Sequence, residues 1–473
     1  MTEAQLNELA PALTTFLERF ASRFRSTPTI DHLHTYARGL LSELPRKTAE
    51  PIALAAGTPV RTLQEFLKDH LWDHDGIGTD LRHHVAQQLA TTPADDLGTV
   101  GLLDETSALK KGDKTPGVSR QYLGCVGKVD DGIVTVHLGV CRGAYQTLID
   151  ADLFLPECWS LDRARCTAAG IPDDVVHRPK WRIALEQLDR ARADGVTLDW
   201  LTFDSEYGRG PDFLRELDDR GQLFVGDVPR RFSCVAAGQS GARPDPKVKG
   251  RAAEEVVRNA TAFRSQKWRV VRLSRQTVED QLWRVKCASV WASGASGWSM
   301  RTYRLMWLCS ETTGEEAFVL SNAGPECPVE RLVRVAFCRA HVEHLFRIGK
   351  SELGFTHFEG RNYVALMRHV RIGVALMAFV AEHTTRLRGE KSTGDRGASV
   401  PGVEVPQRGL VDAGTGDGSA DVGVSGYRLP SAPQPKRNRV QTTTRRSPTH
   451  AQKSQTAKGR KTQTVLRYGK VAL

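Results

Sequence analysis

The chain has 473 residues, a net charge of +11 and 40% hydrophobic residues, so a wholly disordered chain is excluded and two or three domains are expected. Its nine cysteines form no Cys-x-x-Cys pair, which excludes a zinc ribbon and favours reduced thiols, as in a cytosolic protein. The longest apolar run, residues 372–381, is shorter than the roughly 20 residues that span a bilayer, and the start shows no secretory signal.

Residues 1–95 carry the apolar periodicity of helices. In residues 4–24 the apolar side chains recur at helical spacing, at Leu6, Leu9, Leu13, Phe16 and Phe20. The pattern continues in residues 32–44, 62–72 and 83–90. Acidic residues outnumber basic ones here, so we do not expect the whole surface to bind DNA, although one helix could. We predict a helical N-terminal domain over residues 1–95, a candidate for binding DNA ends.

Residues 96–228 combine strand and helix patterns. In chain order we expect strands at 100–104, 121–129, 132–140 and 146–155, a helix at 181–193, a strand at 198–204, a helix at 211–217 and a strand at 223–228. Asp130-Asp131-Gly132 is the expected turn between the second and third strands. The order predicts an α/β fold with a mixed sheet, in which three antiparallel strands lead into parallel ones.

Residues 229–321 differ from the segments on either side. Strand patterns recur at 268–274, 282–292, 300–309 and 316–322, with no convincing helix between them, so we predict an all-β insertion. Residues 228–310 contain 16 Lys and Arg against 5 Asp and Glu, which makes the insertion basic. Trp298 is a candidate for stacking on an unpaired base, with core packing as an equally good alternative. Helical periodicity returns at 329–353 and 363–383, within a segment that we bound at 322–387.

A basic tail ends the chain. Residues 422–473 contain 12 Lys and Arg and no Asp or Glu, so the preceding 421 residues carry a net charge of −1. The segment is poor in large apolar residues, so we predict that residues 388–473 form a disordered linker and basic tail. We favour contact with nucleic-acid phosphates over a role in solubility alone, because the cations are clustered.

Three acids fall where phosphoryl-transfer chemistry would need them. Asp104 and Asp204 each end an apolar strand, and Glu343 lies in the later helical segment. Acids at strand ends lie on the rim of an α/β sheet, and three of them could hold a pair of Mg²⁺ or Mn²⁺ ions. From the residues alone the alternatives stay open: Asp204 could cap a helix, and Glu343 could pair with Arg339, four residues before it.

Four blocks of sequence resemble the bacterial insertion-sequence DDE transposases over residues 100–379. The blocks are Asp104-Glu105-Thr106 with Lys110-Lys111-Gly112, Gly117 to Tyr122 and Gly127 to Asp130; Phe154-Leu155-Pro156 with Trp159, Asp162, Arg165 and Gly170-Ile171-Pro172; Phe203 to Gly208; and Arg339-x3-Glu343-x6-Lys350 with Arg361 and Arg368-His369. The last resembles the family's tyrosine-arginine-glutamate-lysine signature, except that Ala336 stands at the tyrosine position and Phe337 follows it.

The resemblance implies an RNase H-like core and a metal-dependent enzyme. Asp104, Asp204 and Glu343 would bind two Mg²⁺ ions, for which Mn²⁺ can substitute. The enzyme would cut the ends of a mobile element and join them to target DNA by in-line phosphoryl transfer. The implied partner is double-stranded DNA, both element ends and target, bound by a homodimer in the cytoplasm at the nucleoid and not at a membrane.

Basic side chains near the acids are the candidate DNA contacts. The resemblance implies that Arg339 and Lys350 bind DNA phosphates, with pairing to Glu343 and Glu352 as the alternative. Arg120 and Lys128 could hold the same DNA or be solvated charges. His341 and His344 are expected on a helix surface or facing DNA and not as zinc ligands.

Two other functions stay open at this stage. One is a catalytically inactive or domesticated transposase-derived protein that only binds DNA. The other is a metal-dependent nuclease that cuts DNA without joining it.

Overall fold

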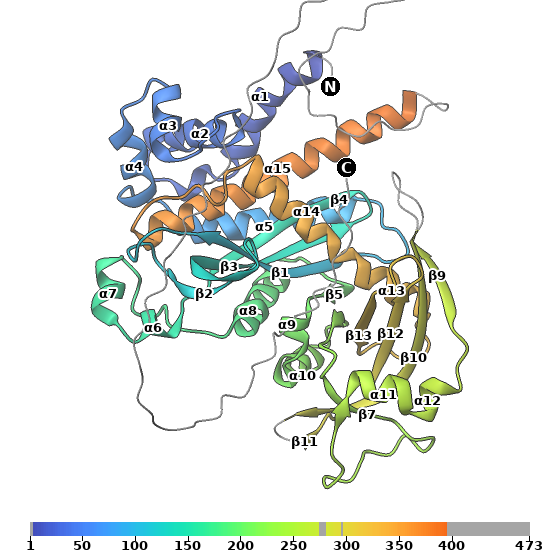
Figure 1. Cartoon of the computed structure of the whole chain (residues 1–473). Helices are drawn as coiled ribbons and strands as arrows, with labels where there is room; N and C mark the ends of the chain where they lie inside the picture. Colours follow the sequence, from blue (N-terminus) through green and yellow to red (C-terminus); the bar gives the residue numbers. More distant parts are fainter. Residues whose placement is uncertain (1–2, 274–280, 295–296, 395–473) are drawn as a thin grey trace, which may run out of the picture. The chain divides into compact units, whose positions relative to one another are not determined.

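A five-stranded mixed sheet forms the core of the part that carries the acids (Figure 1). The computed structural model describes residues 3–273, 281–294 and 297–394, so residues 395–473 of the predicted linker and tail lie outside the described residues. Residues 388–394, predicted to belong to the disordered linker, instead end a long helix. The strands of the sheet are β1 (Val100–Leu109), β2 (Ser119–Leu123), β3 (Lys128–Arg142), β4 (Tyr145–Leu153) and β5 (Trp200–Thr202). β1 pairs antiparallel with β3 and parallel with β5, while β2 and β4 both pair antiparallel with β3. The predicted mixed α/β sheet is therefore confirmed.

The β2–β3 hairpin turns earlier in the chain than predicted. The turn lies between Leu123 and Lys128, where the Leu123 carbonyl accepts the N–H of Gly127 at 2.9 Å. Gly127 has a φ of +66°, a conformation that an L-residue rarely adopts, and this glycine closes the turn. The predicted turn at Asp130-Asp131-Gly132 is wrong, because these residues pair with β2 inside the ladder.

Helices cover both faces of this sheet. Figure 1 shows α8 (Lys180–Ala193) on one side and α14 (Ala340–Ser351) and α15 (Tyr363–Gly394) on the other. α8 contacts β3 and β4, while α14 contacts β1 and β4. Most of β3 and β4 is buried as a result, as expected for a sheet covered on both faces. The shorter helices are α6 (Glu157–Ser160), α7 (Arg163–Ala168), α9 (Ser205–Gly208), α10 (Pro211–Asp219) and α13 (Val329–Cys338).

The N-terminal residues are helical, as predicted. The helices are α1 (Glu3–Glu18), α2 (Thr27–Leu41), α3 (Ala49–Ala55), α4 (Val60–Lys68) and α5 (His74–Thr91), with a 3-10 turn at Ala21–Arg23. Their apolar faces pack together around Phe16, Phe66 and Trp72, which are all buried. α5 contacts both β4 and α15, so the N-terminal helices share a core with the sheet.

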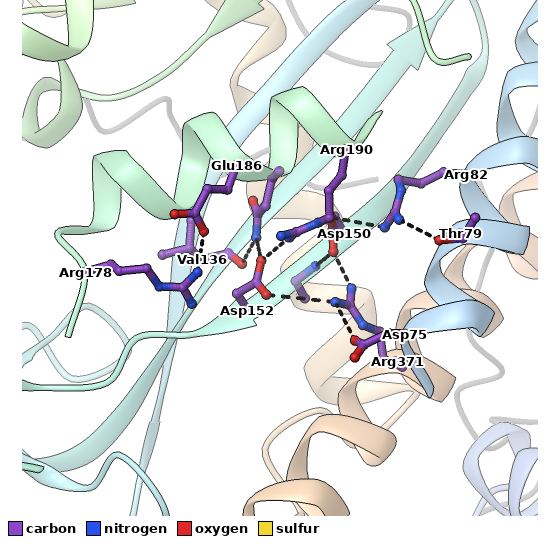
Figure 2. Close-up of polar contacts among 12 residues, drawn as sticks. Asp75, Thr79, Arg82, Val136, Asp150, Asp152, Arg178, Glu186, Arg190 and Arg371 are labelled. Atoms are coloured by element: carbon purple, nitrogen blue, oxygen red, sulfur yellow. Dashed lines mark hydrogen bonds and ion pairs between the residues drawn. The ribbon is translucent and has the colours of Figure 1, made fainter. Parts of the chain in front are cut away.

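A buried charge cluster joins these helices to the sheet at its edge strand β4 (Figure 2). The Asp150 side chain is fully buried, and its carboxylate accepts from Arg82 of α5 at 3.1 Å and from Arg190 of α8 at 2.9 Å. Arg371 of α15 also donates to it. Burial alone would raise the pKa of Asp150, but Arg371, Arg190 and Arg82 outweigh it and hold the pKa below its ordinary value.

The segment predicted as an all-β insertion forms most of a second sheet. Its strands are β6 (Val225–Asp227), β7 (Ser233–Ala236), β8 (Arg251–Ala252), β9 (Arg269–Leu273), β10 (Gln281–Gly294), β11 (Gly297–Trp298), β12 (Tyr303–Ser310) and β13 (Glu316–Ser321). Two helices, α11 (Ala253–Asn259) and α12 (Thr261–Arg264), lie between β8 and β9, so the prediction that the insertion is all β is wrong. Ala253, Val256 and Val257 are buried at helical spacing, and Glu254 and Glu255 favour the helix start.

The strand β6 connects the two sheets. Phe224, just before it, bridges to Leu201 of β5 in parallel, and the Asp227 N–H donates to the Phe203 carbonyl at 3.0 Å. On its other side β6 pairs antiparallel with β13. The chain thus passes from the core sheet to the second sheet at β6, and after β13 it comes back through α13, which contacts β1 and β5.

Helix α15 contains a stretch long and apolar enough to cross a membrane, Tyr363–Thr385. The apolar run of residues 372–381 in the sequence underestimated the length of this apolar stretch, because the small and polar residues that interrupt the run do not end the helix. Of the apolar window, 83% is buried within the fold. The stretch therefore has the burial of a core helix of a folded protein.

Candidate active site

Asp104 lies within β1, and Asp204 lies two residues beyond the end of the adjacent parallel strand β5. The prediction that the first strand ends at Asp104 is wrong, because the pairing of β1 with β3 continues to Leu109. In the β1–β5 ladder Leu102 is opposite Thr202, so two residues further on Asp104 comes alongside Asp204. Asp204 lies two residues after the end of β5 and also caps α9, because its carboxylate accepts the Glu206 N–H at 2.9 Å. Both the strand-end position and the capping alternative recognised in the sequence are therefore present.

Arg339 connects the first and third acids. It lies at the junction of α13 and α14, and its guanidinium Nη1 donates to Asp104 Oδ2 at 3.0 Å. Its Nη2 lies 3.5 Å from Glu343 Oε1. The Arg339 side chain is only 3% exposed, whereas that of Glu343 is 49% exposed. Arg339 thus compensates the negative charge of two acids that are 239 residues apart in the sequence.

The three carboxylates do not form a tight cluster in this conformation. Among the described residues, their oxygens are not all within 4.8 Å of one another. Burial nevertheless raises the pKa of Asp104 to about 7, with Arg339 opposing and the charge of Asp204 adding to the rise. Burial also raises the pKa of Glu343, against the effect of Arg339.

The donor chemistry at this site suits a hard divalent cation. Every candidate ligand is a carboxylate oxygen, the type that Mg²⁺ and Mn²⁺ prefer. The raised pKa of Asp104 means that the negative charge of its buried carboxylate is poorly compensated. A bound cation beside it would compensate that charge and so offset the free-energy cost of burying it. Asp104, Asp204 and Glu343 thus fit a divalent metal by chemistry and by position.

Lys350 lies on the same face of α14 as Glu343, two helical turns further along the helix. Burial lowers the pKa of Lys350, while the charges of Cys125 and Asp104 oppose the decrease. Its ammonium group is therefore within electrostatic reach of Asp104.

Arg120 and Lys128 lie on the β2–β3 hairpin, and both are exposed. Lys128 Nζ is 2.9 Å from Asp130 Oδ2, which partly compensates its charge. Arg120 lines a surface pocket with Asp131 of the paired strand and with Arg165. The hairpin therefore presents solvated cations. This fits both alternatives from the sequence, contact with DNA and solvated surface charge.

Trp298, the candidate for base stacking, is 6% exposed. The indole Nε1 of Trp298 donates to the Asp245 carbonyl at 3.2 Å, and the Arg243 guanidinium donates to the Trp298 carbonyl. The ring is packed under the loop that contains Asp245, so stacking on a base would require that loop to move.

Asp227 is an acid of the site that the sequence analysis overlooked. It ends β6, next to β5, and its Oδ2 is 3.8 Å from Arg339 Nε. The signal was present in the sequence, because Val225-Gly226-Asp227 repeats the pattern of an apolar strand that ends on an acid. Glu105 points the other way, toward Lys180 of α8, as strand alternation predicts.

Comparison with known proteins places these features in a family. The model of the DDE superfamily endonucleases matches residues 19–289, more than half of the chain, and this range includes Asp104 and Asp204. A probable transposase for insertion sequence element IS701 from Microchaete diplosiphon is 32% identical over 204 residues. That alignment covers 42% of this chain and 48% of the relative, so the chain spans about half the length of the curated relative that it matches.

Proposed function

Because the chain belongs to the DDE superfamily endonucleases, we propose that it is a DNA transposase that cuts the ends of an insertion element and joins them to target DNA. One observation carries the proposal: Asp104 within β1 comes alongside Asp204, just beyond the neighbouring parallel strand β5, and Arg339 connects Asp104 to Glu343. The relative that is named a probable transposase favours transposition over simple hydrolysis.

An RNase H-like core is part of this proposal. The strand order β4-β3-β1-β5, with β6 bridged to β5, has three antiparallel strands followed by parallel ones. The proposal assigns residues 96–228 and 322–387 to this core and residues 229–321 to a basic insertion. It assigns residues 1–95 to the helical domain that binds DNA ends and residues 395–473 to the linker and basic tail, after the end of α15 at Gly394.

The proposed reaction needs divalent metal, two Mg²⁺ ions or Mn²⁺ in their place. Bound there, the ions would activate the attacking oxygen and stabilise the charge on the phosphoryl group. Asp104 would hold them from the middle of β1 and Asp204 from just beyond the end of β5, and Glu343 would complete the set from α14. Arg339 is buried against Asp104, so its partner in a DNA complex would be a phosphate close to the cut.

The proposed DNA contacts lie around this centre. Lys350, close to Asp104, would hold the cleaved strand, and Arg120 and Lys128 would contact the same DNA from the β2–β3 hairpin. The basic insertion would bind flanking DNA, with Trp298 available for base stacking only if its loop moves. A homodimer would bring two element ends together, in the cytoplasm at the nucleoid.

The test is strand cleavage and joining on labelled duplexes that carry the DNA flanking the gene. Asp104→Asn and Asp204→Asn keep side-chain size but remove the charge, and each is expected to reduce cleavage by about 100-fold to 1,000-fold. Asp113→Asn, on the exposed loop between β1 and β2, is the matched control and should retain full activity. DNA binding should survive in all three variants.

Each other function has its own outcome in this assay. Cleavage without joining would identify a nuclease. DNA binding that is equal in the unsubstituted protein and its variants, with no cleavage even by the unsubstituted protein in Mg²⁺ or Mn²⁺, would identify a protein that only binds DNA.

A further inference from the structure

Three side chains with soft or borderline ligand atoms meet at the junction of α13 and α14. Cys338 is the last residue of α13, His341 is the second residue of α14, and Cys141 lies near the end of β3. One ligand atom from each, two sulfurs and a ring nitrogen, all lie within 4.8 Å of one another. In the described residues no other three such side chains come this close.

These distances are near those of a tetrahedral zinc site. With Zn–S of about 2.3 Å and Zn–N of about 2.0–2.1 Å, the ligand atoms of such a site lie roughly 3.5–3.8 Å apart. Atoms already within 4.8 Å therefore need movements of about 1 Å or less, which rotation about side-chain bonds can supply. Two thiolates with one imidazole are a ligand set that suits zinc and not magnesium.

Access and local charge also suit a cation. Cys141 is buried, Cys338 is half-buried and His341 is exposed, so the group opens to solvent on one side, where a water could fill the fourth position. Asp95 is close enough for its charge to act on Cys141. The nearby cation Arg334 is paired with Asp96 at 2.5 Å, which reduces its repulsion of a metal ion.

The Cys141 thiol is hydrogen-bonded to Cys338, whose own Sγ donates to the Arg334 carbonyl at 3.4 Å. The pKa of the Cys141 thiol is raised first by its hydrogen bond with Cys338 and then by burial. A metal would therefore displace both thiol protons to solvent as it binds, as at other thiolate sites.

The geometry points to a zinc site formed by Cys141, Cys338 and His341. This differs from the expectation for His341 in the sequence, because Cys141 comes from β3, far away along the chain. Arg339 lies between two of the ligands in sequence, and Glu343 follows two residues after the third. The bound ion would fix the α13–α14 junction to β3, and so hold Arg339 and Glu343 in position relative to Asp104. The inference concerns metal content and does not depend on transposition.

The test is metal content of the full chain, purified with a reductant and dialysed against micromolar zinc. We expect a single equivalent of zinc, and with cobalt a near-ultraviolet thiolate-to-metal absorption band. Cys338→Ala and His341→Ala should each weaken binding about 100-fold or more, since even loss of a residue that only supports a ligand costs about 10–100-fold. The thiolate band separates this site from the carboxylates, and it should persist in Asp104→Asn.

Two matched controls leave the ligands in place. Cys158→Ser removes an exposed cysteine, and His344→Ala removes the other histidine of α14, so both should bind zinc like the unsubstituted protein. Circular dichroism confirms that each variant is folded. Zinc content in the unsubstituted protein no higher than in Cys338→Ala would overturn the inference, as would a Cys141–Cys338 disulfide that forms in place of metal binding.

Discussion

Replacing Asp150 with asparagine tests how the N-terminal helices are held to the core. Asp150 is fully buried on the edge strand β4, where Arg82, Arg190 and Arg371 converge on its carboxylate (Figure 2). Asparagine keeps the volume but removes the negative charge. The guanidiniums of Arg82 and Arg371, whose side chains are 4% and 6% exposed, would then lose a shared partner.

The expected cost follows from what remains of the cluster. Removing one member of a buried ion pair costs about 3–5 kcal/mol, because the other charge stays buried without compensation. Here Asp194 still accepts from Arg82 at 2.7 Å, and Asp152 still pairs with Arg190. Because these partners remain, we expect the substitution to lower the free energy of unfolding by an amount at the low end of this range, about 3 kcal/mol. This corresponds to roughly a 100-fold change in the ratio of folded to unfolded protein.

Urea unfolding followed by circular dichroism measures this cost, with pulse proteolysis as a second probe. Asp113→Asn, which is exposed, should change the free energy of unfolding by no more than about 0.5 kcal/mol. Because the pKa of Asp150 is depressed in the folded state, its stabilisation is present above the ordinary value of about 3.9 and is lost as the pH falls through the lower folded-state pKa.

The difference between the unsubstituted protein and Asp150→Asn should thus be constant from about pH 5 to pH 8 and should narrow below about pH 4. An Asp150→Asn protein within about 0.5 kcal/mol of the unsubstituted one at pH 7 would refute the reasoning. It would mean that the three arginines are adequately compensated by Asp152 and Asp194 alone.

Two further predictions concern the active site. Since burial raises the pKa of Asp104 to about 7, protons should compete with the metal below that pH. The Mg²⁺ concentration for half-maximal cleavage should therefore rise by up to about tenfold for each unit that the pH falls. A Mg²⁺ concentration for half-maximal cleavage that stays the same from pH 5.5 to pH 7 would contradict this. Lys350→Ala should weaken DNA binding and reduce the slope of log K against log salt by about 1, measured by fluorescence anisotropy, whereas an unchanged slope would place Lys350 away from phosphate.

Local patterns predicted the elements around the active site well. The strand that carries Asp104, the strand before Asp204 and the helix that carries Glu343 all depend on apolar periodicity over a few residues, which burial imposes directly, although β1 continues to Leu109 and does not end at Asp104. The errors were also local. An Asp-Asp-Gly turn signal was outweighed by Gly127, whose positive φ closes the hairpin four residues earlier, and the α11 helix was hidden among strand patterns.

The sequence alone thus determined most of the succession of helices and strands, the candidate acids and the family resemblance. Only the tertiary structure decided which distant side chains share a charge or a possible ligand. It placed Arg339 between Asp104 and Glu343, three arginines on Asp150, and Cys141 beside Cys338 and His341. The physical reason is that periodicity reports burial along one element, whereas these pairings depend on how elements far apart in the chain pack together.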